Sequence, residues 1–444
     1  MLTDPIVALA TPPGRSALAV IRLSGRGACE VAARVIPSFR TEPVREARLA
    51  GFRDDEGRLI DRGLYLVFRG PGSETGEDVV EFHCHGGLIV PARLLAAIEA
   101  AGARPARPGE FTRRAVLNGK LDLLQAEGLG DLIDAEAPAQ ARAAISQFEG
   151  GLSRRIATLR AGMVDLLALL AYEVDFPDED DGPVPRERLE AKRAEVAQDV
   201  ARLLDSAPLA ERVRAGALVV LAGAPNAGKS SLFNALLGRD RALVTELPGT
   251  TRDAIEAHAD FLGWPVRLVD TAGLGEAQDR IDALGQAMSR RYLEAADLVL
   301  VCQGGAVARR LGGSARPPDL PASRVLLVRT KADLGDGPGE GLPVSAVTGE
   351  GLGQLRQAVA ERLFQDGAAL ADLEPALTRE RHRVALAGAS RGLSEAAPHL
   401  VPGGDAVLAA HHVQEAVRAL DALMGAVDVE EVLDRVFASF CVGK

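Results

Sequence analysis

Apolar runs and helix-spaced apolar positions divide the chain into segments of different type. Residues 217–222, ALVVLA, form an uninterrupted apolar run typical of a buried parallel strand. Two further strand-like segments stand at 266–273 and 324–333. Residues 121–210 and the stretches from 379 to 440 show apolar residues at helical spacing in Leu-, Ala-, Glu- and Arg-rich sequence. The pattern predicts an α/β unit inserted between two helical stretches, whose ends would lie close together.

A strand of alternating character is predicted within DVVEFHCHGG, residues 78–87. A cysteine between two histidines is a potential metal cluster, but the alternation turns the cysteine to the opposite face, so a shared metal is not expected. Two interpretations of the polar face stay open: the solvent side of a half-buried strand, or the wall of a pocket. The polar face holds Glu81, His83 and His85, and the apolar face holds Val80, Phe82 and Cys84.

Composition narrows the class of protein. A chain of 444 residues with 47% apolar residues can form two to four domains with real cores. With no leader-like start and no apolar run near the length of a membrane span, a soluble cytoplasmic protein is expected. The four cysteines are far apart and form no CxxC pair, which argues against a disulfide framework or a zinc site. The net charge of −11 argues against a broad nucleic-acid-coating surface but leaves a local basic patch open.

Lysine is rare in this chain, with five lysines against 46 arginines. Lysines that persist under such a bias are expected where a compact ammonium is needed. Lys192 lies in a charged helical run and is interpreted as a surface residue, as His411 and His412 are interpreted as ordinary helix residues. The other four lysines fall within motifs: Lys120, Lys229, Lys331 and Lys444.

The segment GAPNAGKS, residues 223–230, follows the strand at 217–222 and precedes a helix-like segment. Strand, GxxxxGK[ST] and helix together are the context of a phosphate-binding loop. Backbone N–H groups would cradle the phosphates, Lys229 would meet the β and γ oxygens, and the Ser230 hydroxyl would reach Mg²⁺. Nucleotide binding is therefore predicted.

Three downstream segments favour GTP over ATP. Asp270 can hold the Mg²⁺ water shell, and Gly273 can offer its N–H to the γ-phosphate. Asp333 can accept two hydrogen bonds from a guanine edge, which adenine cannot supply, and VSA at 344–346 completes a base pocket. Thr330 stands where translation-factor GTPases, which these motifs resemble, usually have Asn, and this change is expected to loosen the tether to the phosphate loop.

Hydrolysis needs a group other than the usual glutamine, because Leu274 follows DTAG. The segment TELPGTTRD, 245–253, offers Thr251 to Mg²⁺, while an oxygen-rich ring suits K⁺ in place of an arginine finger. An ordinary Gly/Pro turn is the alternative for this segment. The K⁺ ligands would be Asn226, Thr245, Leu247 and Thr250. The predicted nucleotide site comprises Asn226, Ala227, Gly228, Lys229, Ser230, Ser231, Thr245, Glu246, Leu247, Pro248, Gly249, Thr250, Thr251, Asp270, Thr271, Ala272, Gly273, Thr330, Lys331, Ala332, Asp333, Ser345, Ala346 and Val347.

These motifs, with a terminal FCVGK, resemble the MnmE family, also called TrmE, of tRNA-uridine-modifying GTPases. The resemblance includes ATPPGRSALAVIRLSG and TGEDVVEFHCHGG near the start, so it spans nearly the whole chain. It implies a multidomain α/β plus α fold. The implied parts are an α+β folate-binding domain at 1–120, a helical domain in two halves at 121–212 and 376–444, and an inserted doubly wound P-loop GTPase domain at 213–375.

The resemblance also implies a tetrahydrofolate site at Arg22, Glu81, Lys120 and Lys444, sealed by the chain's own tail. A carboxylate suits a pterin edge, and cations suit the glutamate tail of a folate. A lipid-attachment signal is the competing interpretation of the tail, but Gly443 and Lys444 fit poorly after Cys441 and no polybasic stretch precedes it. Cys441 is left open between a catalytic thiol and a packing residue.

By the same resemblance, two chains dimerise and their GTPase domains meet across K⁺. Asp282 stands at the family's catalytic Glu position, with Glu276 as a possible substitute. The implied reaction is one-carbon transfer from a 5-formyl- or 5,10-methylene-tetrahydrofolate to C5 of the tRNA wobble uridine, with the flavoprotein MnmG in a heterotetramer. FAD is expected only on that partner, because no GxGxxG follows a strand here. The rival hypothesis is a ribosome-assembly GTPase of the Era/EngA kind.

Overall fold

Two compact units make up the chain: residues Met1–Gly130 with Val417–Lys444, and Asp131–Ala416. Each unit contains one six-stranded sheet. The computed structural model describes residues 4–175, 184–238, 255–270, 290–304, 320–335, 340–364, 377–425, 440 and 443.

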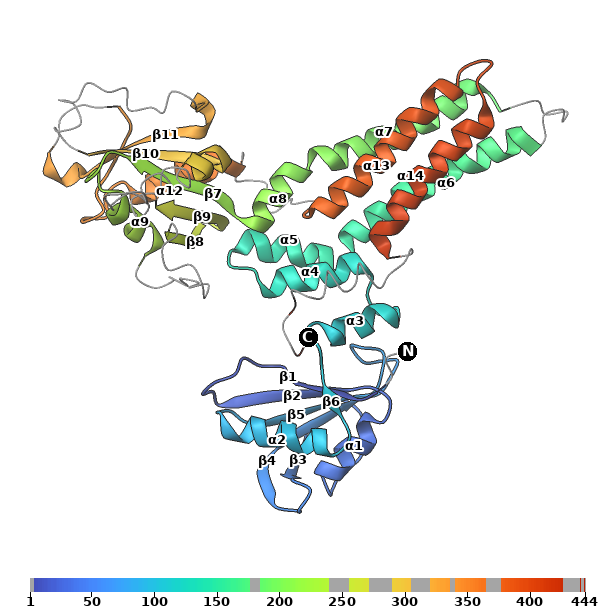
Figure 1. Cartoon of the computed structure of the whole chain (residues 1–444), viewed down its shortest axis with the longest axis vertical. Helices are drawn as coiled ribbons and strands as arrows, with labels where there is room; N and C mark the ends of the chain where they lie inside the picture. The colour runs from blue at the N-terminus through green and yellow to red at the C-terminus, as the bar shows by residue number, and fades with distance from the viewer. Residues whose placement is uncertain are drawn as a thin grey trace, which may run out of the picture. The chain divides into compact units, whose positions relative to one another are not determined.

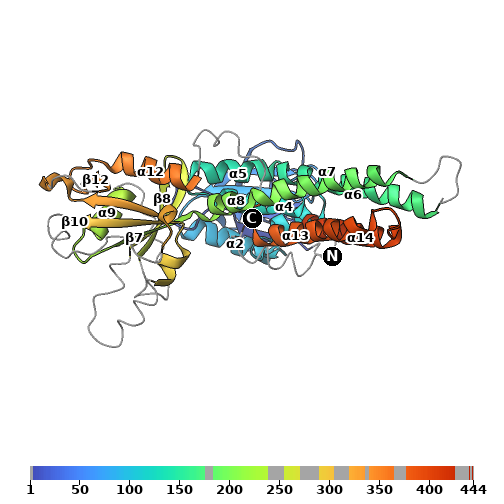
Figure 2. The same cartoon turned by 90° about the horizontal axis from the view of Figure 1, so that it is seen from above.

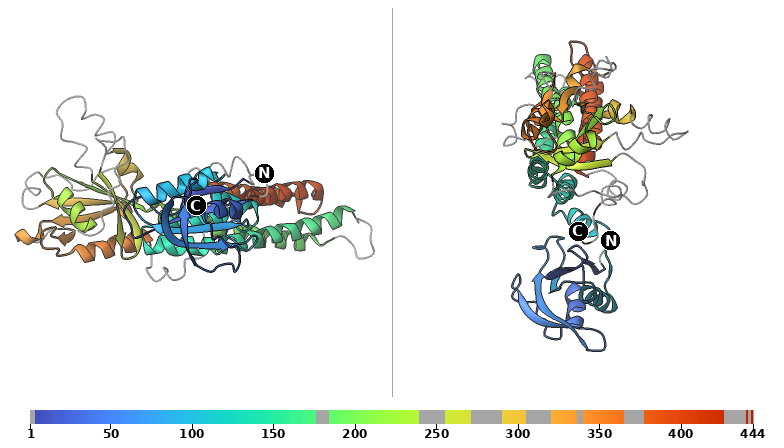
Figure 3. Two further views of the ribbon diagram at one scale, coloured as in Figure 1. Left: turned by 90° about the horizontal axis from the view of Figure 1, so that it is seen from below. Right: turned by 90° about the vertical axis from the view of Figure 1, so that its left-hand side faces the viewer.

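The first unit is built on a sheet of order β3-β4-β5-β2-β1-β6, antiparallel except for the parallel pair β1 and β6. Helices α1 and α2 pack on one face of this sheet (Figures 1 and 3). On the other face, Phe111 of α3 packs with Ile6 and Ala8 of β1. The elements are β1 Ile6–Leu9, β2 Leu18–Ser24, α1 Ala28–Val35, β3 Arg48–Arg53, β4 Leu59–Phe68, β5 Val79–His85, α2 Ile89–Ala100, β6 Arg104–Pro105 and α3 Glu110–Leu117.

Strand β5 shows the alternation predicted for residues 78–87. Val80, Phe82 and Cys84 are buried against the helical face, while Glu81 and His83 are partly exposed on the other face. Burial raises the pKa of the Cys84 thiol to about 11, with the nearby Asp61 carboxylate adding to the rise. This cysteine is therefore a protonated packing residue at neutral pH.

The second unit contains a sheet of order β12-β11-β10-β7-β9-β8, parallel except for β8, which runs antiparallel to β9. Both faces are covered: Val219 and Leu221 of β7 enter one core, and Leu218 and Val220 enter the other. This explains the uninterrupted apolar run at 217–222. The elements are β7 Ala217–Gly223, α9 Lys229–Leu237, β8 Ile255–Phe261, β9 Trp264–Asp270, β10 Leu298–Gly304, β11 Val325–Thr330, β12 Leu342–Val344 and α12 Leu352–Phe364, with short 3₁₀ turns η2 Ala322–Arg324 and η3 Ala332–Leu334.

The second sheet and its helices occupy residues 217–364, called the sheet segment below. Long helices that precede and follow this segment in the sequence pack against each other. Helix α7 packs against both α6 and α13 (Figure 2). Helices α4 and α14 each extend across a boundary between the two compact units. The helices are α4 Leu123–Ile133, α5 Pro138–Phe148, α6 Gly151–Asp175, α7 Arg186–Asp205, α8 Ala207–Ala215, α13 Glu380–Ala396 and α14 Ala406–Met424, with the 3₁₀ turn η5 Ala397–His399.

One carboxylate connects both ends of the sheet segment. Asp131 accepts a hydrogen bond at 3.1 Å from Nε of Arg214, which lies just before β7. The same oxygen accepts a second one at 2.7 Å from Nη2 of Arg379, which directly precedes α13. The residues just before β7 and just before α13 are thus both bonded to one residue of α4. Among the described residues, no helix combines the length and apolar character that a membrane crossing requires.

Candidate nucleotide and folate sites

The phosphate-loop sequence connects strand β7 to helix α9, as predicted. Gly228 adopts the left-handed conformation directly before α9, and Asn226 also has a positive φ of 60°. A side chain at Gly223 would collide with the chain, because its Cβ would lie 2.4 Å from the carbonyl oxygen of Cys302. The loop therefore depends on glycine at its start and at its end.

Lys229 is held inside this loop. Its side chain is 8% exposed, and its Nζ donates hydrogen bonds at 3.0 Å to the carbonyl oxygens of Gly223 and Ala224. No ion pair joins this ammonium to a carboxylate among the described residues. A buried cation at the start of a helix suits an anionic ligand, so the residues present fit the phosphates of a nucleotide.

Thr330 ties strand β11 to the phosphate loop. Its hydroxyl donates to the carbonyl oxygen of Ala227, and the neighbouring Lys331 donates from Nζ to the carbonyl oxygen of Asn226 at 3.0 Å. The shorter threonine therefore still contacts the phosphate loop, at a position where a looser tether was expected. Its hydroxyl offers one donor, whereas the amide of an asparagine offers two.

Asp333 and Ser345, two residues of the predicted base pocket, contact each other and are called the base corner below. The Ser345 hydroxyl, fully buried, donates to Oδ1 of Asp333 at 2.7 Å. The same hydroxyl accepts hydrogen bonds from the backbone N–H groups of Val347 and Thr348. These contacts fix the orientation of an exposed carboxylate, as guanine recognition requires.

Asp270 ends strand β9 beside the phosphate loop. The strand register places it opposite Leu221, two residues before Gly223, and its side chain is 1% exposed. Burial raises the pKa of the neighbouring Cys302 thiol to about 12, with Lys229 opposing and Asp270 adding to the rise. A carboxylate and an ammonium therefore border the loop, which is the charge arrangement that Mg²⁺ and phosphate together need.

In the first unit, Arg22 of β2 and Glu81 of β5 face each other across paired strands. Nε and Nη2 of Arg22 both donate to Oε1 of Glu81, at 3.1 and 3.0 Å. Oε2 of Glu81 lies 3.4 Å from Nε2 of His83, and the Arg22 guanidinium lies 5.9 Å from the centre of the Phe111 ring. Because both arginine bonds use one oxygen, the other oxygen retains capacity to accept from an amino-pyrimidine edge.

The loop between β4 and β5 connects this pair to Lys120. Glu74 of the loop lies 2.6 Å from Arg22, and Pro71 accepts a hydrogen bond at 3.0 Å from Nζ of Lys120. Sequence reasoning missed Glu74, because an acidic residue in a Gly- and Ser-rich loop carries no pattern of its own. The loop brings three of the four predicted folate residues into one region.

The two described residues near the end of the chain contact the N-terminal segment of the first unit, residues Met1–Gly130. The Phe440 ring packs on Gly130, where an added Cβ would lie 3.0 Å from the ring. Gly443 is buried with φ of 104°, and a Cβ there would lie 2.4 Å from the carbonyl oxygen of Leu9. Ala8, next to Leu9 in β1, pairs with Arg22.

Family models match nearly all of the chain. The model described as the GTP-binding protein TrmE N-terminus matches residues 5–120, and that of the MnmE helical domain matches residues 123–441. The tRNA modification GTPase MnmE of a Thermus thermophilus strain is 46% identical over 453 residues, covering 100% of this chain and 99% of its own length. That of Acidiphilium cryptum is 44% identical, covering 100% and 99%. The chain belongs to the MnmE family of tRNA modification GTPases.

Membership of the MnmE family makes the chain a GTP-hydrolysing, tRNA-modifying enzyme, and it confirms the predicted fold class. The relatives cited carry the name of tRNA modification GTPases, so the ribosome-assembly hypothesis is not supported. Among solved structures, the G domain of the T. maritima FeoB iron transporter covers 33% of this chain at 28% identity, with 98% of its own length matched. Its TM-score of 0.25 is too low to add to the assignment.

The described part of the predicted nucleotide site brings together residues of the phosphate loop, of β9 and of the base corner. The remaining predicted residues lie outside the described part of the chain, and their roles stay predictions. They are the stretch 245–251, the stretch 271–273, Glu276, Asp282, Cys441 and Lys444.

Proposed function

We propose that this enzyme, with a flavoprotein of the MnmG kind, adds an aminomethyl or carboxymethylaminomethyl group to C5 of uridine 34 in tRNA. A tetrahydrofolate, when bound, supplies the one-carbon unit, and GTP hydrolysis controls the reaction. A homodimer joined to two MnmG chains is the proposed assembly. The observation that carries the folate part is the cluster of Arg22, Glu81 and Glu74 beside Phe111.

The four predicted folate residues and Phe111 have distinct tasks in holding a folate. Glu81 accepts hydrogen bonds from the pterin edge, while Lys120 and Lys444 attract the carboxylates of the glutamate tail. Arg22 orients Glu81 by two bonds to one oxygen. Phe111 offers an aromatic face next to this pair.

Calorimetric titration of 5-formyl-tetrahydrofolate into the full chain tests this assignment. Glu81→Ala is expected to weaken binding at least tenfold, since a charged hydrogen bond contributes about 1.5–3 kcal/mol. Asp61→Asn is the matched control, because Asp61 is a carboxylate of the same sheet that pairs with His85 instead. Equal affinity of the Glu81→Ala protein and the wild type removes Glu81 from the site.

For the nucleotide site, we propose GTP with Mg²⁺ at Ser230 and Thr251, and K⁺ at Asn226, Thr245, Leu247 and Thr250. Lys229, already inside the loop, is positioned to meet the phosphates. K⁺ would supply the positive charge that an arginine finger gives elsewhere and would join two GTPase domains. Hydrolysis is expected to run at least tenfold faster in potassium than in sodium buffer at equal ionic strength. Equal rates would exclude K⁺ from the site.

Asp282 is proposed to polarise the attacking water, with Glu276 as the alternative. Replacing Asp282 by Asn keeps the shape but removes the negative charge, so GTP hydrolysis is expected to fall at least tenfold while GTP binding persists. Single-turnover kinetics measure the rate of GTP hydrolysis, and an equilibrium titration measures GTP binding. A normal rate in the Asp282→Asn protein assigns the task to another residue.

A further inference from the structure

Five ionisable side chains gather where helices α13 and α14 approach each other. Three of the seven histidines of the chain take part, together with two glutamates. None of them belongs to the nucleotide or folate sites described above. The five are Glu395, His399, His411, His412 and Glu415.

The approach of the two helices depends on a glycine. A Cβ at Gly392 would lie 2.7 Å from the carbonyl oxygen of His412 and 3.1 Å from the Cβ of Ala416. Glu395 follows Gly392 by one turn of α13, and His412 precedes Ala416 by one turn of α14. The small residues therefore place Glu395 and His412 opposite each other at short range.

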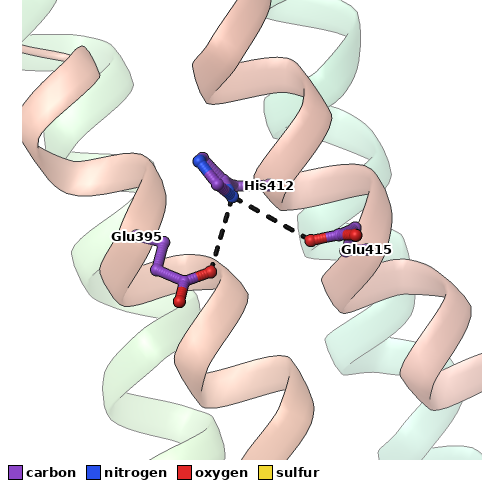
Figure 4. Close-up of side chains that lie close together, drawn as sticks. All are labelled: Glu395, His412 and Glu415. Atoms are coloured by element: carbon purple, nitrogen blue, oxygen red, sulfur yellow. Dashed lines mark ion pairs between the residues drawn. The ribbon is translucent and has the colours of Figure 1, made fainter.

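His412 directs one nitrogen at two carboxylates. Its Nδ1 lies 3.5 Å from Oε2 of Glu395 and 4.0 Å from Oε2 of Glu415 (Figure 4). This nitrogen is buried from solvent and makes no hydrogen bond within the described part of the chain. All three potential ligand atoms lie within 4.8 Å of one another.

These separations are too long for hydrogen bonds, which have N···O distances of about 2.7–3.2 Å. Around a tetrahedral zinc ion with bonds of about 2.0–2.2 Å, neighbouring ligand atoms are about 3.3–3.6 Å apart. The 3.5 Å distance between His412 and Glu395 already matches this spacing. A small rotation of the exposed Glu415 side chain would shorten its 4.0 Å distance from His412 to the same range.

Two other imidazole rings lie next to the His412 ring. The His399 ring stacks on it with centroids 5.7 Å apart and an angle of 18°. The His411 ring meets it at 5.5 Å and 63°. These neighbours limit the space into which the His412 ring can rotate.

We propose that Glu395, His412 and Glu415 bind one divalent transition-metal ion of the zinc class. Nδ1 of His412 and one oxygen from each carboxylate provide three ligands, and solvent takes the remaining position. The two negative charges balance the ion, and an imidazole ligand favours zinc over Mg²⁺ or Ca²⁺. The ion crosslinks α13 to α14 and so stiffens the helical segment that follows the GTPase sheet.

This proposal revises the interpretation of His412 as an ordinary helix residue. The sequence argument against zinc considered cysteines, and here the ligands are a histidine and two glutamates from different helices. Only His412 and Glu415 share a local spacing, three residues apart on one helix.

The test uses the full-length, untagged, nucleotide-free chain, because an added histidine tag would bind zinc itself. Competition with a chromogenic zinc indicator is expected to show one zinc ion per chain, and zinc is expected to raise the thermal midpoint by a few degrees. The Glu395→Gln/Glu415→Gln double variant is expected to bind zinc at least tenfold more weakly. Its far-ultraviolet circular dichroism checks that the helices remain folded.

Glu136→Gln is the matched control. It removes the carboxylate that lies 2.7 Å from Nδ1 of His258, a pair that has no third metal-ligating side chain among the described residues. This variant is expected to keep the full zinc stoichiometry and the zinc-induced thermal shift. The proposal is overturned if the wild type takes up no zinc, or if the double variant retains wild-type zinc binding.

Discussion

At the scale of single residues, Thr330 shows how one hydroxyl can connect two parts of a nucleotide site. It reaches the phosphate loop through Ala227 and also contacts the carbonyl oxygen of Gln303 on the adjacent strand. The residues proposed for base recognition and phosphate binding, Asp333 and Lys229, are therefore attached to each other through the end of β11.

Replacing Thr330 by Ala is expected to weaken GTP binding about fivefold. Loss of one hydrogen bond between neutral groups costs about 1 kcal/mol, and the buried acceptor on the loop loses a partner. Equilibrium binding of a fluorescent GTP analogue measures the change. Thr330→Ser keeps the hydroxyl and is expected to bind like the wild type, so equal weakening in both variants would contradict the tether.

Residue types and spacing alone predicted the strand, loop and helix around GAPNAGKS and grouped Asp333 with Ser345, and the structure has both features. These motifs are local in sequence, and their backbone geometry follows from glycine and helix-start chemistry. Glu74 and Glu395 escaped prediction for the opposite reason. Each acquires its partner, Arg22 or His412, only through tertiary packing that no periodicity reports.

At the scale of elements, a buried ionic group joins β6 to α3. Glu110 is 2% exposed and accepts hydrogen bonds from the side chains of Arg104 and Arg114 and from the backbone N–H of Arg107. Burial by itself raises the pKa of Glu110, but these hydrogen bonds lower it from 4.5 to about 2. The fold therefore favours the ionised carboxylate strongly.

This lowered pKa predicts acid sensitivity of α3. The ionised Glu110 stabilises the fold above about pH 4.5, and the contribution, on the order of 3 kcal/mol, is lost as the pH falls toward 2. Hydrogen–deuterium exchange of α3 in the full chain measures it at matched pH. At pH 5 the amides of α3 are expected to exchange more slowly in the wild type than in Glu110→Gln. This difference in exchange rate should be smaller at pH 3. A constant difference would contradict the assignment.

The docked tail gives a second prediction at this scale. Gly443→Ala places a Cβ 2.4 Å from the carbonyl oxygen of Leu9, so the tail should leave β1. Carboxypeptidase digestion is expected to accelerate, and affinity for 5-formyl-tetrahydrofolate is expected to fall about tenfold.

Gly403→Ala is the control for backbone strain. Gly403 has a similar positive φ of 82°, but an added Cβ there meets nothing within 4 Å. Both substitutions carry the left-handed penalty of about 1–2 kcal/mol, and only Gly443→Ala adds a collision. Identical digestion and folate binding of the two variants would contradict tail docking.

Strands were easier to predict than helix contacts. The runs at 217–222 and 324–333 correspond to β7 and β11 because a buried parallel strand is apolar on both faces. Helical spacing identified the regions of α13 and α14. A periodic pattern shows which face of a helix is buried, but it does not show which other helix packs on that face. The close approach at Gly392 therefore emerged only from the structure.

At the scale of the whole molecule, movement in the GTPase sheet can reach the helices through Asp131. Its carboxylate holds Arg214 before β7 and Arg379 before α13. A hydrolysis-driven change that shifts either arginine must act on the same point of α4.

Asp131→Asn is expected to separate hydrolysis from modification. The amide weakens both charged contacts, so GTP hydrolysis should stay within about twofold while modified wobble uridine falls severalfold. Glu380→Gln, which disrupts an exposed pair with Arg383, is the matched control and should change neither. Parallel loss of both activities in Asp131→Asn would indicate a general loss of structure instead.

The most direct test of the central claim is mass spectrometry of tRNA nucleosides from cells that lack this chain. We predict that C5-modified wobble uridine disappears, that the wild-type chain restores it, and that Lys229→Met does not because its loop cannot hold GTP phosphates. Normal wobble uridine in the deletion strain would contradict the account.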